Sequence, residues 1–348
     1  MRAVGTVTRQ RMLAVAFGPP TMAAARAGLP DIREQADCLE LRLDLFGEPF
    51  DLPVILRERG KLPVVATLRP IDQGGKSTLP ADERLRVLLD AAELGAEYVD
   101  LEYDVATAAA ISSVRAAGAQ VIASRHDFAA MPDLAGDWWP RLAELGADIV
   151  KVVGTARELG DCLQVFRALA RADQPTIAIA MGEAGLITRV LALRADACFL
   201  TYAALELATG TAPGQLTIRD MRETYRAGRL RSTTRVFGLL GPHTEEERLR
   251  EYNAWFDAEG FDGVAVPFVA ERDAVPVVAT FRELPVSGWH VHGTSLQTDV
   301  RQAMDELRPA AARQDKVNSV VRRARDGSLV GDWVESPREQ YEQWCAEN

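Results

Sequence analysis

Several patterns that mark particular protein classes are missing from this chain of 348 residues. Its four cysteines, Cys38, Cys162, Cys198 and Cys345, are scattered, with no CxxC spacing and no cysteine–histidine cluster. This argues against a disulfide scaffold or a structural zinc site and fits a reducing cytoplasm. No apolar run reaches the roughly 18 residues that a membrane span needs. We read the N-terminal segment as a strand and not as a signal peptide.

The chain also lacks an excess of positive charge, because 50 Asp and Glu residues outnumber 40 Lys and Arg residues and give a formal net charge of −10. That balance argues against a nucleic acid or an anionic membrane as the main partner. It leaves room for a local basic pocket that binds a small acidic substrate. The 47 % of hydrophobic residues suffices for a sizeable core, and the length allows more than one domain.

Short apolar runs alternate with amphipathic segments between about residues 12 and 220. Parallel strands buried on both faces have this near-continuous apolar character, so the pattern predicts a parallel sheet covered by helices. Eight such strands fit a closed (β/α)8 barrel, and a doubly wound open sheet is the alternative. The predicted strands are 13–17, 38–44, 63–69, 97–103, 120–126, 147–153, 175–181 and 197–203.

The sequence changes character after the eighth predicted strand. An arginine-dense segment, 222–235, reads as an interdomain linker. We therefore expect a barrel domain over 1–221 and a smaller α/β domain over 236–348, which begins with the strand-like run VFGLL.

The carboxyl ends of barrel strands face the active site in (β/α)8 enzymes. A mixture of acids and cations stands at these ends and suits a small anionic substrate. The residues at the predicted ends are Glu40, Arg42, Arg69, Glu102, His126, Lys151, Met181 and Tyr202.

Lys151 is the most informative of them, because it interrupts the apolar run Ile149–Val153. An isolated buried lysine has a lowered pKa, and the resulting neutral amine is the nucleophile of Schiff-base enzymes. The alternative is an outward lysine with its head in solvent. His126 ends the preceding strand and suits proton transfer near neutral pH, although a lone histidine is more often structural.

Three weaker signals accompany this pair. Glu40, Arg42 and Asp44 alternate with leucines, so we expect them on one strand face, as substrate ligands or as an ion-pair network. Arg189 follows a glycine turn at the start of a predicted helix and could clamp a carboxylate. Gln215 follows Ala-Pro-Gly in a tight, lid-like turn.

Taken together, residues 12–220 resemble the type I 3-dehydroquinate dehydratase family. No single segment is specific, but seven follow in order, each at a strand end. They are ELRLDLF (40–46), TLRPIDQGGKS (67–77), YVDLEYD (98–104), SRHDF (124–128), DIVKVVG (148–154), AMGEAGLITRV (180–190) and APGQL (212–216).

The resemblance implies a (β/α)8 barrel that dehydrates 3-dehydroquinate to 3-dehydroshikimate in the shikimate pathway, without metal or organic cofactor. Lys151 matches the imine-forming lysine, His126 the general base, and Glu102 the carboxylate that orients that histidine. Type I relatives also suggest a homodimer. The other matched positions imply substrate contacts: Glu40, Arg42, Arg69, Met181, Arg189, Tyr202, Thr211 and Gln215. Tyr202 stands where the family usually has phenylalanine, and Thr211 where it usually has serine.

Residues from about 236 are similar to the substrate-binding domain of shikimate dehydrogenase, through VFGLLGPHT (236–244), FDGVAVPFV (261–269) and DGSLVGDW (326–333). This sequence departs from the family pattern at the positions that carry out the reaction. His290 and His292 replace the family's asparagine and threonine, and Leu296 stands at its catalytic lysine. No Gly-x-Gly-x-x-Gly follows a predicted strand, and the sequence ends before a nucleotide domain. We therefore expect no dehydrogenase activity; a metal pair at the two histidines lacks a clear third ligand.

Three interpretations stay open. The first is a working dehydratase with a degenerate C-terminal part. The second is another Schiff-base barrel enzyme of the aldolase type, against which the SRHDF and APGQ segments argue. The third is a non-catalytic regulatory protein, which the altered C-terminal part favours and the intact barrel set opposes.

Overall fold

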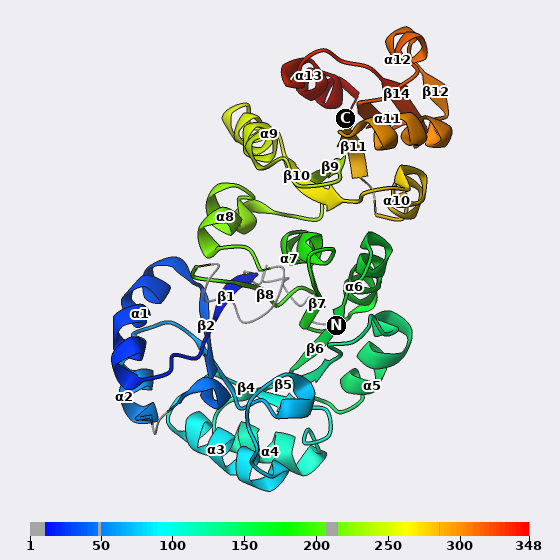
Figure 1. Cartoon of the computed structure of the whole chain (residues 1–348). Coiled ribbons are helices and arrows are strands. Elements are labelled where there is room, and N and C mark those ends of the chain that lie inside the picture. The colour runs from blue at the N-terminus through cyan, green and yellow to red at the C-terminus, as the bar shows by residue number, and fades with distance from the viewer. Residues whose placement is uncertain (1–10, 48–49, 207–214, 285, 348) are drawn as a thin grey trace, which may run out of the picture.

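Eight parallel strands form a nearly closed barrel in the computed structural model, which describes residues 11–47, 50–206, 215–284 and 286–347 (Figure 1). The strand order is β7-β6-β5-β4-β3-β2-β1-β8. A bridge between Thr176 and Cys198, just before β8, links the two ends. The strands are β1 Met12–Phe17, β2 Cys38–Arg42, β3 Val64–Thr67, β4 Tyr98–Glu102, β5 Gln120–His126, β6 Ile149–Thr155, β7 Thr176–Met181 and β8 Leu200–Ala203. The predicted barrel is confirmed.

Helices cover the outside of this barrel (Figure 1). Threonine caps several of them: the Thr21, Thr107 and Thr217 side chains accept from backbone N–H groups in the first turn. The helices that follow the strands are α1 Met22–Gln35, α2 Leu52–Glu58, α3 Ala81–Glu93, α4 Ala108–Ala116, α5 Trp139–Ala143, α6 Cys162–Arg171, α7 Leu186–Leu191 and α8 Ile218–Glu223.

The alternation of side chains along each strand decides what enters the barrel. On β6, Ile149 and Val153 belong to the apolar cluster inside the barrel, whereas Val150 and Val152 belong to the cluster under the helices. Because side chains alternate with a period of two, Lys151 points inward with Ile149 and Val153. The barrel therefore holds an apolar floor with polar layers above it, toward the strand ends.

A second, mixed sheet follows, in the order β10-β9-β11-β13-β14-β12. Its core includes the buried rings of Phe237, Tyr252, Phe256 and Trp344. Its strands are β9 Arg235–Gly241, β10 Gly263–Val269, β11 Val286–Val291, β12 Glu306–Leu307, β13 Ser319–Arg322 and β14 Leu329–Asp332. Its helices are α9 Glu246–Ala258, α10 Ala274–Thr280, α11 Thr294–Asp299, α12 Pro309–Gln314 and α13 Pro337–Glu347. The expected smaller α/β unit is confirmed.

The arginine-dense segment between the two sheets is bonded to both. Arg222 on α8 donates to the backbone of Gln35 and pairs with Asp37 in the barrel. Arg229 pairs with Asp257 on α9. The second unit lies beside α6, α7 and α8 (Figure 1). None of the helices in the described part of the chain is long and apolar enough to cross a membrane.

Candidate active site

Lys151 lies at the centre of a buried ion-pair cluster inside the barrel. Its Nζ is 2.9 Å from an oxygen of Asp100, 3.3 Å from one of Glu40 and 3.1 Å from the hydroxyl of Tyr202. The side chain is 4 % exposed. The expected inward, buried lysine is thus confirmed. The sequence argument assumed an isolated charge, and this is wrong, because two carboxylates on other strands face Lys151.

Asp100 carries the shortest contacts of this cluster. It accepts from Arg69 at 2.7 Å and from the hydroxyl of Ser124 at 2.5 Å, besides Lys151. Burial alone would raise the pKa of Asp100, but the charges of Arg69 and Lys151 outweigh it and hold this pKa well below its usual range. Asp100 is therefore a fixed carboxylate anion beside the lysine.

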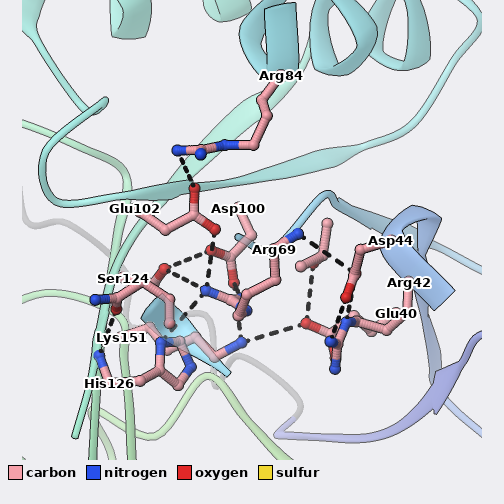
Figure 2. Close-up of polar contacts among 12 residues, drawn as sticks. Glu40, Arg42, Asp44, Arg69, Arg84, Asp100, Glu102, Ser124, His126 and Lys151 are labelled. Atoms are coloured by element: carbon pink, nitrogen blue, oxygen red, sulfur yellow. Dashed lines mark hydrogen bonds and ion pairs between the residues drawn. The ribbon is translucent and has the colours of Figure 1, made fainter. Parts of the chain in front are cut away.

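Glu102, two residues further along β4, is in a different state. Figure 2 shows it between two arginines, with Oε1 3.2 Å from Arg69 and Oε2 3.6 Å from Arg84. These contacts are longer than those of Asp100, and burial raises the pKa of Glu102 to about 7 against the charge of Arg69. The negative charge of β4 is thus concentrated on Asp100. The Glu102 carboxylate accepts a hydrogen bond from Arg69 and forms ion pairs with Arg69 and Arg84. None of these side-chain contacts is to His126.

His126 ends β5 at the mouth of the site. Its Nδ1 is 3.3 Å from Arg69, and its backbone N–H donates to Gln73. An arginine only donates, so this contact favours a neutral ring with a lone pair on Nδ1. Loss of hydration, together with the charges of Arg69 and Lys151, lowers the pKa of His126 well below its usual value. The ring is therefore held in its neutral form.

The segment after Glu40 departs from the expected strand face. β2 ends at Arg42, and Asp44 lies in a 3-10 turn, Leu43–Leu45. The turn brings the Asp44 carboxylate back onto Arg42, with two contacts at 2.9 and 2.7 Å. The alternation of side chains along the strand therefore places Glu40 and Arg42 on one face, as expected, but it does not extend to Asp44. Asp44 instead forms a structural ion pair with Arg42.

A cavity above Lys151 gathers most of the predicted residues. It contains about 530 Å³ of space and opens to solvent at the carboxyl ends of the strands. Glu102 lies behind Arg69, and Thr211 lies outside the described residues. The predicted residues that line the cavity are Glu40, Arg42, Arg69, His126, Lys151, Met181, Arg189, Tyr202 and Gln215.

Arg189 also lines the cavity. It lies on α7, is 2 % exposed, and burial lowers its pKa to about 10. An anion that enters the cavity would stabilise this buried charge, so Arg189 is suited to bind a carboxylate. Tyr202, which also lines the cavity, adds a hydroxyl that donates to Glu40 at 3.3 Å.

Sequence reasoning missed four residues of the site. Asp100 and Ser124 lie two positions before Glu102 and His126, so period-two alternation from these residues would have found both. Phe128, 48 % exposed, forms part of the cavity wall and lies against Gly74, where a Cβ would meet the ring at 2.0 Å. Only the folded loop reveals that contact.

The histidines of the second unit also come together. The rings of His290 and His292 are 6.1 Å apart, and those of His243 and His292 are 5.0 Å apart. His290 bonds Glu245 at 3.0 Å and Gln340 at 2.7 Å. Within the described ranges, no group of three or more His, Cys, Asp or Glu side chains is arranged to hold a metal ion.

Comparison with known proteins identifies one family, with single-function and multifunctional relatives. Residues 13–231 match the family model of type I 3-dehydroquinase. A bifunctional 3-dehydroquinate dehydratase/shikimate dehydrogenase of Arabidopsis thaliana chloroplasts is 33 % identical over 305 residues, 85 % of this chain and 50 % of the relative. A 3-dehydroquinate dehydratase of Methanopyrus kandleri is 39 % identical over 199 residues, 55 % of this chain and 87 % of the relative. The chain thus spans about half the length of the plant relative.

Two solved structures share the architecture. The dehydroquinate dehydratase and shikimate dehydrogenase part of S. pombe AroM matches with a TM-score of 0.54 and 25 % identity, covering 93 % of this chain and 65 % of that one. The 3-dehydroquinate dehydratase of Geobacillus kaustophilus matches with a TM-score of 0.55 and 25 % identity, covering 61 % and 88 %. The first likeness extends through both units of the chain.

Proposed function

Because the chain belongs to the type I 3-dehydroquinase family, we propose that it dehydrates 3-dehydroquinate to 3-dehydroshikimate through an imine on Lys151. The observation that carries the proposal is a buried lysine that faces a cavity, with a neutral histidine at the cavity mouth. A nucleophilic amine and a base of this kind are the two groups that such a reaction needs. Metal and organic cofactors are not required.

Imine formation is the first step. Lys151 passes a proton to neutral His126, and its amine attacks the C3 carbonyl of the substrate. The carbonyl oxygen takes one proton from the attacking nitrogen and the one that His126 returns, and it leaves as water. The product is a C3=N bond to Lys151, protonated on nitrogen. The cationic nitrogen then draws electrons from C2 and acidifies its hydrogen.

Elimination follows on the same residues. His126 takes the C2 proton on its unprotonated ring nitrogen, and the electrons of the C–H bond form an enamine. The enamine electrons then expel the C1 hydroxyl, which leaves as water with the proton from His126. Hydrolysis of the conjugated imine by one water molecule releases 3-dehydroshikimate and restores the lysine.

Substrate binding uses the charges on the cavity wall. Arg189 is positioned to receive the substrate carboxylate, because its buried guanidinium group lines the cavity above Lys151. The ring hydroxyls and the closure of the site are assigned to four other residues of the cavity wall: Glu40, Arg42, Arg69 and Gln215. Glu102 is assigned a positioning role that acts through Arg69, which touches both Glu102 and His126.

For the second unit, we propose that it performs no hydride transfer. Leu296, at the position where the resemblance expects a catalytic lysine, is buried in the apolar core. His290 is bonded to Glu245 and Gln340. Incubation with shikimate and NADP+ should therefore give no NADPH, and formation of NADPH would contradict this assignment.

The dehydratase proposal is tested by ultraviolet absorbance of purified protein with 3-dehydroquinate, without added metal or nucleotide. We expect absorbance of the conjugated enone to rise, and borohydride added with substrate to stop the reaction and attach the reduced substrate to Lys151. A folded protein that shows neither turnover nor an adduct would overturn the proposal.

A further inference from the structure

Asp100 is the polar group closest to the proposed nucleophile, and no role follows for it from the steps above. Its Oδ2 lies 2.9 Å from Lys151 Nζ, whereas Tyr202 and Glu40 lie at 3.1 and 3.3 Å. Asp100 is completely buried. The atom it touches is the atom that becomes the imine nitrogen.

We propose that Asp100 is the catalytic counter-ion of the cationic imine on Lys151. This inference rests on the proposed Schiff-base reaction. The carboxylate stabilises the positive charge on nitrogen, and so keeps the imine protonated throughout the cycle. Only the protonated imine is a strong electron sink, so an imine that lost this proton would release the C2 hydrogen slowly.

The surroundings of Asp100 fix both its charge and its direction. Ser124 donates to Oδ1, which leaves Oδ2 for Lys151 and Arg69. The carboxylate keeps its charge because these three donors surround it. A buried anion held by fixed donors can stabilise a nearby cation without rearranging during the reaction.

Glu40 is the other carboxylate near Lys151, but its geometry suits a different task. Its Oε1 is shared among Lys151 at 3.3 Å, Tyr202 at 3.3 Å and Thr67 at 2.9 Å. Glu40 also lines the cavity, whereas Asp100 lies outside the cavity wall. A residue that meets the substrate must change partners when substrate binds, whereas Asp100 can hold its contact with the nitrogen.

The charge balance around the nitrogen includes groups from several elements. The titratable and charged groups around Lys151 and its cavity are Glu40 and Arg42 on β2, Arg69 after β3, Asp100 on β4, His126 on β5, Arg189 on α7 and Tyr202 on β8. Four of these groups, Arg42, Arg69, His126 and Arg189, are cationic or become so. Removing Asp100 therefore leaves the imine cation among positive neighbours, with Glu40 as the remaining carboxylate in this set.

The test compares the full-length chain with Asp100→Asn, which keeps the shape and removes the charge. Saturating 3-dehydroshikimate forms the conjugated imine, and its protonated form absorbs at longer wavelength than its neutral form. We expect the alkaline midpoint of this band to fall by about one pH unit or more in Asp100→Asn, since a nearby opposite charge shifts a pKa by 1–3 units. Turnover should fall at least tenfold.

Glu102→Gln is the matched control, because Glu102 also bonds Arg69 from β4 but does not touch Lys151. We expect a clearly smaller shift of the midpoint in this variant. An unchanged midpoint in Asp100→Asn, with an adduct still trapped on Lys151, would overturn the counter-ion role and leave the dehydratase proposal intact. Failure of the wild-type chain to form any adduct would instead overturn the dehydratase proposal.

A measurement on the wild-type chain covers the case in which Asp100→Asn does not fold. The imine of 3-dehydroshikimate with n-butylamine in water supplies the reference midpoint, without protein charges. We expect the midpoint on Lys151 to lie above this reference by about one unit or more. A midpoint at or below the reference would contradict a stabilising counter-ion.

Discussion

Lys151 must serve two states, because it is held between carboxylates before substrate arrives and attacks as an amine afterwards. The chain has only four lysines, and Lys61 is exposed on the surface. We expect Lys151→Ala to abolish both turnover and borohydride trapping, and Lys61→Ala to retain both. Mass spectrometry of the reduced protein locates the adduct. An adduct that persists in Lys151→Ala would place the imine on another residue.

The same substitution has a cost in stability, because it removes the cation between Asp100 and Glu40. Breaking a buried ion pair by removing one partner costs about 3–5 kcal/mol. Thermal unfolding of the variant must therefore accompany the activity measurement. Loss of activity counts for the imine only at a temperature where Lys151→Ala is folded.

The protonation state of His126 is the second expectation at the scale of the residue. Burial and the charges of Arg69 and Lys151 lower its pKa, so the imidazole should titrate below 6.5, its ordinary value. NMR titration of the ring proton measures this, and comparison with His126→Ala assigns the signal among four histidines. Arg69→Gln removes a neighbouring charge and should move the midpoint upward. A wild-type midpoint above 6.5 would contradict a ring kept neutral by its surroundings.

At the scale of the element, strand β4 carries two carboxylates whose pKa values move in opposite directions. The Glu102 carboxyl has a pKa of about 7 when folded, against 4.5 as the ordinary value. Between these values the folded chain keeps a proton that the unfolded chain has released, so this group reduces stability as pH rises through that window. The substitution Glu102→Gln removes this titratable carboxyl group and its effect on stability.

We therefore expect the stability of Glu102→Gln, relative to wild type, to increase from pH 4.5 to 7 by up to about 3 kcal/mol. Urea unfolding at several pH values measures the difference. Glu83→Gln on α3 removes an exposed carboxylate and should keep the wild-type slope. Parallel stability curves for Glu102→Gln and wild type would show that Glu102 is ionised throughout this range.

Strand periodicity also explains how much of the site could be predicted. Apolar runs locate the strands, and their polar ends locate Glu40, His126 and Lys151, because a parallel barrel brings all carboxyl ends to one mouth. Periodicity fails at Asp44, where the chain leaves the strand for a 3-10 turn. It cannot tell that Arg69 meets Asp100 more closely than Glu102, because that choice depends on the three-dimensional path of the arginine side chain.

At the scale of the whole molecule, the two units meet at a surface that contributes little to the cavity. Every described residue that lines the cavity lies between Glu40 and Gln215, before the second sheet begins at Arg235. One contact across the surface is the ion pair of Arg167 on α6 with Glu283, at 2.7 Å, and both side chains are about half exposed. Exposed pairs of this kind contribute about 0–1 kcal/mol.

This arrangement predicts that a chain ending at residue 232 folds and keeps its turnover of 3-dehydroquinate. The cut preserves the bond from Arg11 to the backbone of Leu230 and that from Arg194 to Ser232, so the end of the barrel stays attached. It also exposes apolar surface near Phe166, which lines a groove with Leu284, so some loss of thermal stability is expected. Circular dichroism of both chains measures folding, and initial rates with 3-dehydroquinate measure turnover. A shortened chain that is folded but inactive would show that the second unit regulates the site or completes it.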